Sequence, residues 1–443
     1  MSYDGKEHSK HIEDKAASVL TMPHVESQTL ARRRPSVFTR VTAMLMLFLV
    51  FFFVEHAFMA PRHTIYAITR FFGAKEQQVH NFYPYEWPIP NDLNIDHCAE
   101  FQEGQFWNGE QSATASFDLP LNSDKHFLLA RGSYTNGWVY IGQSEDVSLD
   151  TAKVEVTVKY QDDELELAKV CKVSRAGNEN GIGFFTPRHA HRNHIHLGFD
   201  VRVLLPKTPL TIQDFRTDLP LFSQHVGELE TVFFESITLH GAMMPIHVES
   251  VSAAVGKFKN ANSPIEGKFN TSTSLDLATA NSPINVILGL FNADEEESTT
   301  VSMESANAPI SAGISLFSTA PSSTGGKFDV KAYTARGKIE LGFIDASVDS
   351  ALDLTAHTAM GPVDVTMHPT YEGEFRLATI MGRAEVTTAD EVEDPKGEDR
   401  KRSVSFERAG GSIVAGRVWW GEEDKGRGTV DLKTSLSGVK LAL

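Results

Sequence analysis

The chain has 443 residues, of which 41% are hydrophobic and 22% are charged, and its formal net charge is -17. A chain of this length normally folds into more than one structural unit, and its apolar content is ample for a buried core. The acidic balance repels a phosphate backbone, so nucleic acid is excluded as an expected partner.

Residues 1–40 mix polar and charged residues without a sustained apolar period, which predicts a disordered tail. Residues 41–60, "VTAMLMLFLVFFFVEHAFMA", then form an apolar run long enough to cross a bilayer as a helix. A buried soluble helix is the alternative interpretation. A cleaved signal peptide is disfavoured because the polar leader is long and Pro61 follows the run.

Basic residues gather on the N-terminal flank of this run, at Arg32, Arg33, Arg34 and Arg40. The positive-inside rule then places the N-terminus in the cytosol. We therefore expect a single-pass integral membrane protein whose C-terminal part is lumenal or extracellular.

This topology bears on two features of the sequence, its two cysteines and one glycosylation sequon. Cys98 and Cys171 are the only cysteines, and in an oxidising compartment they could form one disulfide or remain two buried thiols. Asn270 begins the one usable N-glycosylation sequon, Asn-Thr-Ser, since proline occupies the third position of the Asn-Ser-Pro sequences.

The next two segments are a connector and a first folded region. Residues 61–109 contain several prolines and aromatic residues, which predicts an extended connector. From 110 to 225, apolar alternation and β-branched runs are separated by Gly, Asn, Asp and Ser. This pattern predicts a β-rich, β-sandwich-like domain.

A histidine cluster lies inside this region. On a strand, His194 and His196 would share a face and could bind zinc or copper, with His189 and His191 as further ligands. No acidic or cysteine partner at a recognisable spacing completes the set. A strand edge with solvated histidines is the favoured interpretation, so we expect no metal and no cofactor.

Residues 226–387 repeat one short turn followed by an apolar, alternating run, as in "ATANSPINVILGLF". The residue after the turn aligns at Ile246, Ile265, Ile284, Ile310, Ile339 and Val363. Asn, Gly and Pro suit a tight corner, and one such unit cannot bury its apolar face alone. The pattern favours a β-solenoid-like stack, with ordinary antiparallel hairpins as the alternative.

Two segments complete the chain. Residues 388–403 form a charged loop in which Lys401 and Arg402 could be a dibasic processing site, although a solvated loop is the favoured interpretation. Residues 404–443 are expected to form C-terminal β-repeats, in which "LSGV" replaces the Pro-containing turn, as "MGRA" at 381–384 does at the end of the preceding repeat region.

Many short segments together resemble uncharacterised basidiomycete proteins with the DUF7330 domain, over roughly residues 80 to 443. They include "LLARGSYTNGWVYI", "AKVCKVSRAGNENGIGFFTP", the "NSPI" and "NAPI" turns and "GRGTVDLKTSLSGVKLAL". The resemblance implies an adhesin-like β-repeat protein with a membrane segment near its N-terminus. It implies no activity and no catalytic residue.

The expected function follows from this architecture and from the expected location outside the cytosol. We expect a membrane-anchored, β-repeat ectodomain that serves as a structural, adhesive or glycan- or protein-binding surface, with cell-wall glycans or surface proteins as partners. The alternatives are a polysaccharide-acting β-helix enzyme and a lipid-handling β-groove scaffold. The enzyme is disfavoured because no catalytic motif is found and the carboxylates do not repeat from unit to unit, at Asp329, Asp345, Asp349, Asp353 and Asp364.

Overall fold

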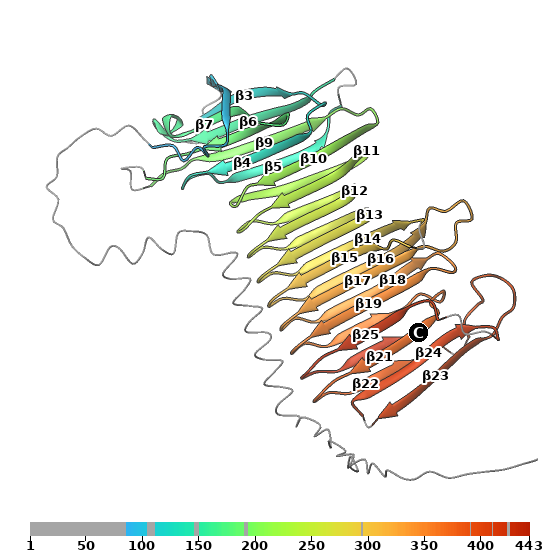
Figure 1. Cartoon of the computed structure of the whole chain (residues 1–443). Helices are drawn as coiled ribbons and strands as arrows, with labels where there is room; N and C mark the ends of the chain where they lie inside the picture. Colours follow the sequence, from blue (N-terminus) through green and yellow to red (C-terminus); the bar gives the residue numbers. More distant parts are fainter. Residues whose placement is uncertain are drawn as a thin grey trace, which may run out of the picture. The chain divides into compact units, whose positions relative to one another are not determined.

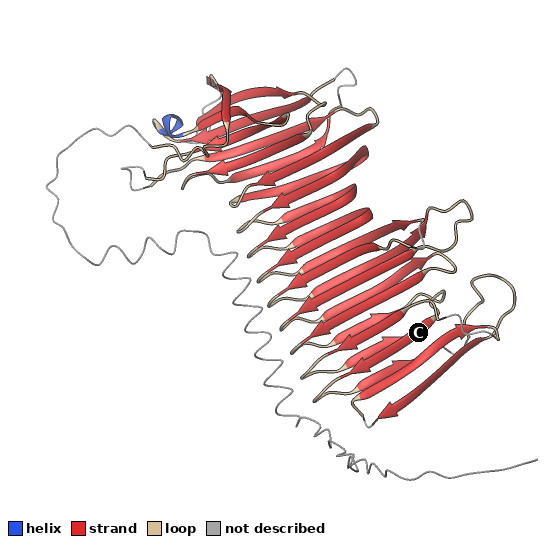
Figure 2. Cartoon of the chain, viewed as in Figure 1, coloured by secondary structure: helices blue, strands red, loops and turns tan. Residues whose placement is uncertain are grey.

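The computed structural model describes residues 86–103, 111–145, 150–189, 194–293, 296–389, 391–409, 411–422 and 426–443. These residues belong to one compact unit, Tyr83–Leu443. They form strands and one short 3-10 helix, η2 (Glu164–Leu167), as Figure 2 shows. The mainly β class is therefore confirmed, whereas the tail at 1–40 and the membrane helix at 41–60 lie outside the described residues.

Two ladders of parallel strands run along this unit (Figure 1). Ladder A contains, in spatial order, β8 (Glu179–Phe185), β4 (Lys125–Arg131), β10 (Leu210–Asp218), the second halves of β11 (Phe222–His240), β12 (Ile246–Asn260) and β13 (Ile265–Thr279), then β15 (Thr299–Ser305), β17 (Lys327–Thr334), β19 (Ala351–Thr358), β25 (Thr429–Lys433) and β21 (Gly373–Ala378).

Ladder B contains the other strand of each rung. Its order is β9 (Gly198–Leu205), β5 (Gly137–Gln143), the first halves of β11, β12 and β13, then β14 (Ile284–Asn292), β16 (Ile310–Ser318), β18 (Ile339–Ala346), β20 (Val363–Thr366), β26 (Val439–Ala442) and β22 (Ala384–Thr387). From β4 and β5 onward in this order, a short turn joins each A strand to the B strand of its rung. We call the edge formed by these turns the corner row.

The hydrophobic core lies between the two ladders. Alternate residues of each strand are buried, for example Ile284, Val286 and Leu288 of β14, because successive side chains of a strand point to opposite faces. Leu316 of ladder B and Leu352 of ladder A line the same internal hollow, so the inner faces of the ladders meet. The outward residues of both ladders leave two broad outer faces.

The turns of the repeats are stacked in register. The residues after the turns pair one to one across neighbouring strands of ladder B and are buried: Ile246, Ile265, Ile284, Ile310, Ile339 and Val363. Val363 pairs next with Val439, and Val439 pairs with Ala384. The aligned repeat positions of the sequence are thus neighbours in space, about 4.8 Å apart from rung to rung.

Buried hydroxyl groups hold the corner row together. The Thr334 hydroxyl donates a hydrogen bond to the Ala308 carbonyl of the preceding turn and accepts one from the Gly337 N–H of its own turn. Thr358 repeats both bonds with Gly337 and Gly361. At these two turns one threonine before the turn therefore satisfies backbone groups of two rungs, which a buried turn needs.

The remaining strands cover the two ends of the ladders. At the N-terminal end these are β1 (Asn94–Cys98), β2 (Gln102–Glu103), β3 (Gln111–Leu119), β6 (Ala152–Tyr160) and β7 (Lys169–Arg175), and at the C-terminal end β23 (Arg402–Ala409) and β24 (Ile413–Trp420). All of them make antiparallel pairs. Antiparallel strands at both ends limit the exposed edges of the parallel stack.

The spatial order of the rungs departs from the chain order at both ends. The rung of β4 and β5 lies between β8/β9 and β10/β11, and the rung of β25 and β26 lies between β19/β20 and β21/β22. The C-terminal strands are thus inserted into the stack, and the Leu443 N–H at the C-terminus bonds to the Thr387 carbonyl at the end of β22.

Three expected boundaries need correction. The boundary at residue 225 falls inside β11, and strands of the expected sandwich-like region at 110–225 join the same two ladders. Within 404–443 only β25 and β26 form a rung, because β23 and β24 are an antiparallel hairpin. Within 61–109, the described residues 86–103 carry β1 and β2. Apolar alternation reveals a strand but not its partner, which explains these differences.

Candidate functional site

Four ring side chains form a continuous row on the outer face of ladder B. Trp138 and Tyr140 of β5 stack with ring centroids 5.8 Å apart and planes at 15°. Tyr140 stacks on His225 of β11 at 5.5 Å and 20°, and His225 stacks on His247 of β12 at 5.0 Å and 19°. We call Trp138, Tyr140, His225 and His247 the outer-face platform.

Strand register places these rings side by side. Tyr140 pairs with His225, and His225 pairs with His247, so the three residues occupy equivalent positions on neighbouring rungs. Val139 and Val226, which follow the opposite phase of the alternation, are fully buried in the core. The platform side chains therefore occupy the outward-facing positions of the same strands whose inward-facing side chains form the core.

Two glycines leave room for the Tyr140 ring on the outer face of the sheet. A Cβ atom at Gly142 would stand 2.3 Å from the Tyr140 ring, and a Cβ at Gly227 would stand 2.6 Å from its hydroxyl oxygen. Any side chain at either position would collide with the ring. The Tyr140 ring therefore covers a part of the outer face that carries no side chain.

Polar groups border the platform. The His225 Nε2 atom lies 3.0 Å from the Glu249 Oε1 atom. In the next rungs His247 pairs with Glu266, whose carboxylate accepts a 3.3 Å hydrogen bond from the Asn285 amide, and on the other side Tyr140 pairs with the exposed Arg202. Donors and acceptors thus lie next to an apolar ring surface.

The hollow recorded among the described residues is small. It has a volume of about 10 Å³ and is lined by Leu316, Phe343, Leu352, Met367, Tyr371 and neighbouring residues. A space of this size accommodates one water molecule rather than a ligand. The open outer face is thus the more substantial candidate site in the described part of the chain.

The carboxylates considered for an enzyme lie apart from this platform. Asp329 and Asp353 are neighbours on the outer face of ladder A, where Asp329 pairs with Lys331 at 2.6 Å and Asp353 accepts a 2.6 Å hydrogen bond from Thr429. Asp364 pairs with Lys338 at 2.9 Å. These carboxylates are engaged in surface ion pairs and hydrogen bonds.

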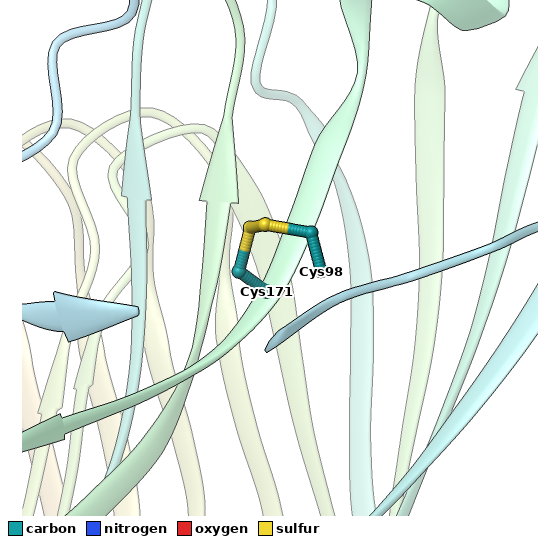
Figure 3. Close-up of a disulfide and its surroundings, with 2 residues drawn as sticks. All are labelled: Cys98 and Cys171. Carbon is teal, nitrogen blue, oxygen red and sulfur yellow. A yellow bond between two sulfur atoms is a disulfide. The ribbon is translucent and has the colours of Figure 1, made fainter. Parts of the chain in front are cut away.

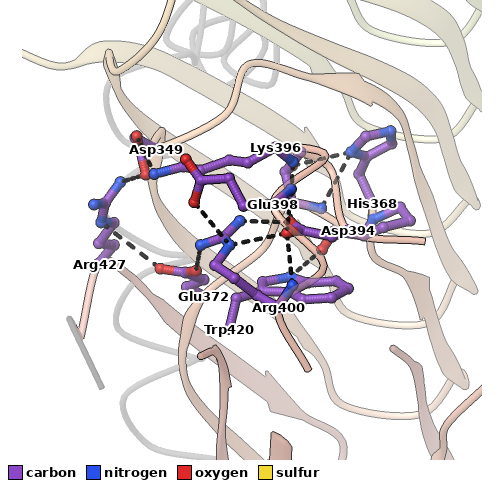
Figure 4. Close-up of polar contacts among 11 residues, drawn as sticks. Asp349, His368, Glu372, Asp394, Lys396, Glu398, Arg400, Trp420 and Arg427 are labelled. Carbon is purple, nitrogen blue, oxygen red and sulfur yellow. Dashed lines mark hydrogen bonds and ion pairs between the residues drawn. The ribbon is translucent and has the colours of Figure 1, made fainter. Parts of the chain in front are cut away.

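The charged segment at 388–403 is docked rather than free, as Figure 4 shows. Asp394 accepts hydrogen bonds from the Arg400 guanidinium and from the backbone N–H groups of Lys396 and Glu398. The hydrogen bonds from Arg400 and the backbone hold the pKa of Asp394 well below its usual range. These bonds fold the segment upon itself.

Ion pairs then hold this segment against the stack. Lys396 pairs with Asp349 at 2.8 Å, and Asp349 also pairs with Arg427. Arg400 lies 3.6 Å from Glu372 and over the Trp420 ring (Figure 4). The network joins three segments distant in sequence, which is a structural role.

The dibasic pair lies in an ordered strand pairing. Arg402 begins β23, pairs with Trp420 and has its guanidinium 6.0 Å from the Trp420 ring. The Lys401 carbonyl accepts a hydrogen bond from the Gly421 N–H. Cleavage here requires opening of the β23–β24 hairpin.

The described histidines of the cluster considered for a metal lie in the segment before β9, and not on a strand edge as expected. His189, His194 and His196 are exposed, and the backbone N–H of His196 bonds to the Glu164 carboxylate. His191 lies outside the described residues. No group of three or more His, Cys, Asp or Glu side chains suited to a metal is found among the described residues.

Asn270 lies in the middle of β13 rather than in a surface loop. Its amide donates a 3.2 Å hydrogen bond to the Ser252 hydroxyl, and its side chain is half-buried. A glycan at this position would have to be added before the strand pairs.

Cys98 and Cys171 are joined in a disulfide (Figure 3). The two residues face each other across the antiparallel pair of β1 and β7. The bond fastens β1 to the N-terminal end of ladder A.

The comparisons with known proteins give no family. No protein-family model and no curated protein matches the chain. No helix among the described residues is long and apolar enough to span a bilayer.

Solved structures give distant likenesses only. A candidate cell adhesion protein from Clostridium sporogenes ATCC 15579 has 8% identity and a TM-score of 0.16, covering 75% of this chain and 99% of its own. A candidate lipid binding protein from Parabacteroides distasonis ATCC 8503 has 8% identity and a TM-score of 0.27, covering 75% and 96%. A candidate adhesin from Parabacteroides merdae ATCC 43184 has 10% identity and a TM-score of 0.19, covering 55% and 96%. At these TM-scores the likeness says nothing about what this chain binds.

Proposed function

We propose that the two-ladder stack is a displayed binding surface for carbohydrate, with the outer-face platform as its contact. The observation that carries this proposal is the row of four stacked rings with polar groups at its border. Aromatic rings offer broad, rigid, apolar surface at low entropic cost. A sugar ring presents an apolar C–H face to such a surface, while its hydroxyl groups reach donors and acceptors beside it.

The membrane anchor expected at 41–60 would display this surface outside the cytosol. The disulfide supports a location outside the cytosol, because disulfides persist in oxidising compartments. A rigid stack held at a cell surface, binding glycans of the cell wall or of another cell, serves an adhesive role. Binding to an extended polymer suits an open face, since a chain can lie across several rungs.

A pull-down with insoluble polysaccharides tests this function. The unit Tyr83–Leu443 is incubated with chitin, β-glucan and mannan particles, beside Tyr140→Ala and the matched control Tyr333→Ala. Tyr333 is a half-buried tyrosine of ladder A that makes an edge contact with His357. We expect retention of wild type and of the Tyr333 variant on at least one polymer and loss of the Tyr140 variant. Absence of retention on all polymers would reject carbohydrate binding.

A further inference from the structure

At one equivalent position of the corner row, the side chain is polar in the middle rungs of the stack and apolar in the last rungs. At seven turns a backbone N–H at this position bonds to a carbonyl of the neighbouring turn, and the residues carrying it are Met243, Asn262, Asn281, Asn307, Met360, Leu436 and Met381. In the turn at 335–338 the corresponding bond comes from the Ala335 N–H instead. In the middle of the stack the asparagines form a ladder, in which Asn281 bonds to Asn262 at 2.8 Å and Asn307 bonds to Asn281 at 2.7 Å. In the last three rungs this polar ladder is replaced by apolar side chains.

These apolar side chains are largely exposed. Met360 and Leu436 are each 51% exposed, Met381 is 75% exposed, and the adjoining Ile380 is 48% exposed. We call these four residues the C-terminal corner stripe. They follow one another on neighbouring rungs, because Leu436 N–H bonds to the Ala359 carbonyl and Met381 N–H bonds to the Ser435 carbonyl.

The fold itself does not need an apolar stripe at this place. Thr358, Thr434 and Thr379 hold the three turns by buried hydroxyl hydrogen bonds to Gly337, Gly361 and Ser437. The stripe side chains lie outside these bonds and contribute little to the core. A contiguous row of exposed Met, Leu and Ile side chains is typical of a binding surface.

The charges around the stripe favour one kind of partner. Exposed Arg336 occupies the turn before the stripe, and exposed Arg383 follows Met381 in the last turn. The turns at 335–338, 359–362, 434–438 and 379–383 contain no Asp or Glu, although the chain carries a net charge of -17. The nearest flanking carboxylates along the chain are Glu340 and Asp364, which both pair with Lys338, and Glu385 of β22.

We propose that the C-terminal corner stripe docks onto the surface of a phospholipid bilayer. The Met, Leu and Ile side chains enter the boundary between head groups and acyl chains, while the two guanidinium groups contact lipid phosphates. Arginine suits this position because its planar fork binds phosphate oxygens in pairs. The stripe lies at the opposite end of the stack from the outer-face platform, so both surfaces can be occupied at once (Figure 1).

Site-directed fluorescence on the full chain tests this proposal. The two native cysteines form the disulfide, so the substitution Met381→Cys or Asn281→Cys gives one free thiol for an environment-sensitive label. The labelled chain is reconstituted into vesicles of phosphatidylcholine and phosphatidylserine that contain nitroxide-labelled lipid. Asn281 is the matched control because it holds the equivalent turn position in the middle of the stack.

We expect quenching to be about threefold stronger at position 381 than at position 281, since only the stripe would enter the head-group region. Adding Met360→Ser and Arg383→Glu should reduce quenching at 381 to the level at 281, with circular dichroism confirming an intact fold. Equal quenching at both positions, quenching at neither, or quenching unaffected by the two substitutions would overturn the proposal. Docking of a protein instead of lipid would give no quenching by lipid at 381.

Discussion

Tyr140 and His225 stack across the junction between β5 and β11, with ring centroids 5.5 Å apart and planes 20° from parallel. The contact joins two rungs by their outward side chains, whereas Val139 and Val226 beside them join the same rungs by burial in the core. Successive residues of these strands thus contribute in turn to the buried core and to the outer face. A change at a position that orients the rings should alter binding without altering the core.

A substitution at Gly142 tests whether binding can be altered without altering the core. We expect Gly142→Ala to displace the Tyr140 ring, since the added Cβ would stand 2.3 Å from it, and to weaken carbohydrate binding about fivefold, as loss of one stacking contact of about 1 kcal/mol would do. Binding is measured by affinity electrophoresis and stability by thermal unfolding. Gly342→Ala is the control, because no heavy atom lies within 4 Å of its added Cβ. Equal binding by both variants would contradict the role of Gly142.

His126 predicts how stability depends on pH. Its Nε2 atom bonds to the Pro120 carbonyl at 2.9 Å, its Nδ1 atom has no hydrogen-bond partner among the described residues, and burial lowers its pKa below the ordinary 6.5. Because the unfolded chain then binds the proton more readily, this contribution to stability is complete above about pH 6.5 and is lost as the pH falls toward the lowered folded-state pKa.

Denaturant unfolding between pH 7.5 and 5 measures this effect. We expect stability to fall on acidification, by about 1.4 kcal/mol for each unit of pKa difference, and His126→Gln to flatten part of the slope. Burial lowers the pKa of His357 and His368 in the same direction, so part of the slope should remain. His189→Gln, at an exposed position, is the control, and an unchanged slope in His126→Gln would argue against the assignment.

The inserted C-terminal rung predicts a strong effect at the end of the chain. Leu441 is fully buried in β26, between β20 and β22, so Leu441→Ala should cost about 2 to 5 kcal/mol by leaving a cavity. Hydrogen exchange should then increase in β21 and β22 as well as in β26. Lys440→Ala, at the neighbouring exposed position, should change little. Exchange confined to β26 would show that the rung does not support its neighbours.

The disulfide predicts a dependence on redox conditions. Cys98 and Cys171 close a loop with a sequence separation of 73, so reduction should destabilise the unit by up to about 4 kcal/mol in the chain-entropy description. Denaturant unfolding with and without reductant measures the difference, and faster amide exchange in β1 should accompany it. Identical midpoints would mean that β1 is held by other contacts.

The repeated turn is the part of this fold that a single sequence can reveal. A proline inside a central strand would remove a ladder hydrogen bond, but Pro283 lies in a corner directly before Ile284, and the same arrangement recurs before Ile265 and Ile310. The recurring threonine before the turn, at Thr334 and Thr358, adds a hydrogen-bonding signal that could have strengthened the prediction. Local chemistry determines the corner, so local sequence is enough to find it.

The order of the rungs and the platform depend on pairing between distant segments. Nothing local in "TVDLK" or "VKLA" indicates that these strands insert between β19/β20 and β21/β22. Likewise Trp138 and Tyr140 are visible as alternate outward residues next to Gly142, but His225 and His247 join them only through strand register. Register is set by the whole core, so neither feature could be read from a motif.

The most direct test of the account is isothermal titration calorimetry of the chain with the soluble oligosaccharide of whichever polymer retains it. Trp138→Ala removes one ring of the platform, and we predict at least about tenfold weaker binding, while Tyr333→Ala binds as wild type does. Binding that is unchanged by Trp138→Ala, or weakened equally by Tyr333→Ala, would contradict the assignment of the platform as the carbohydrate contact.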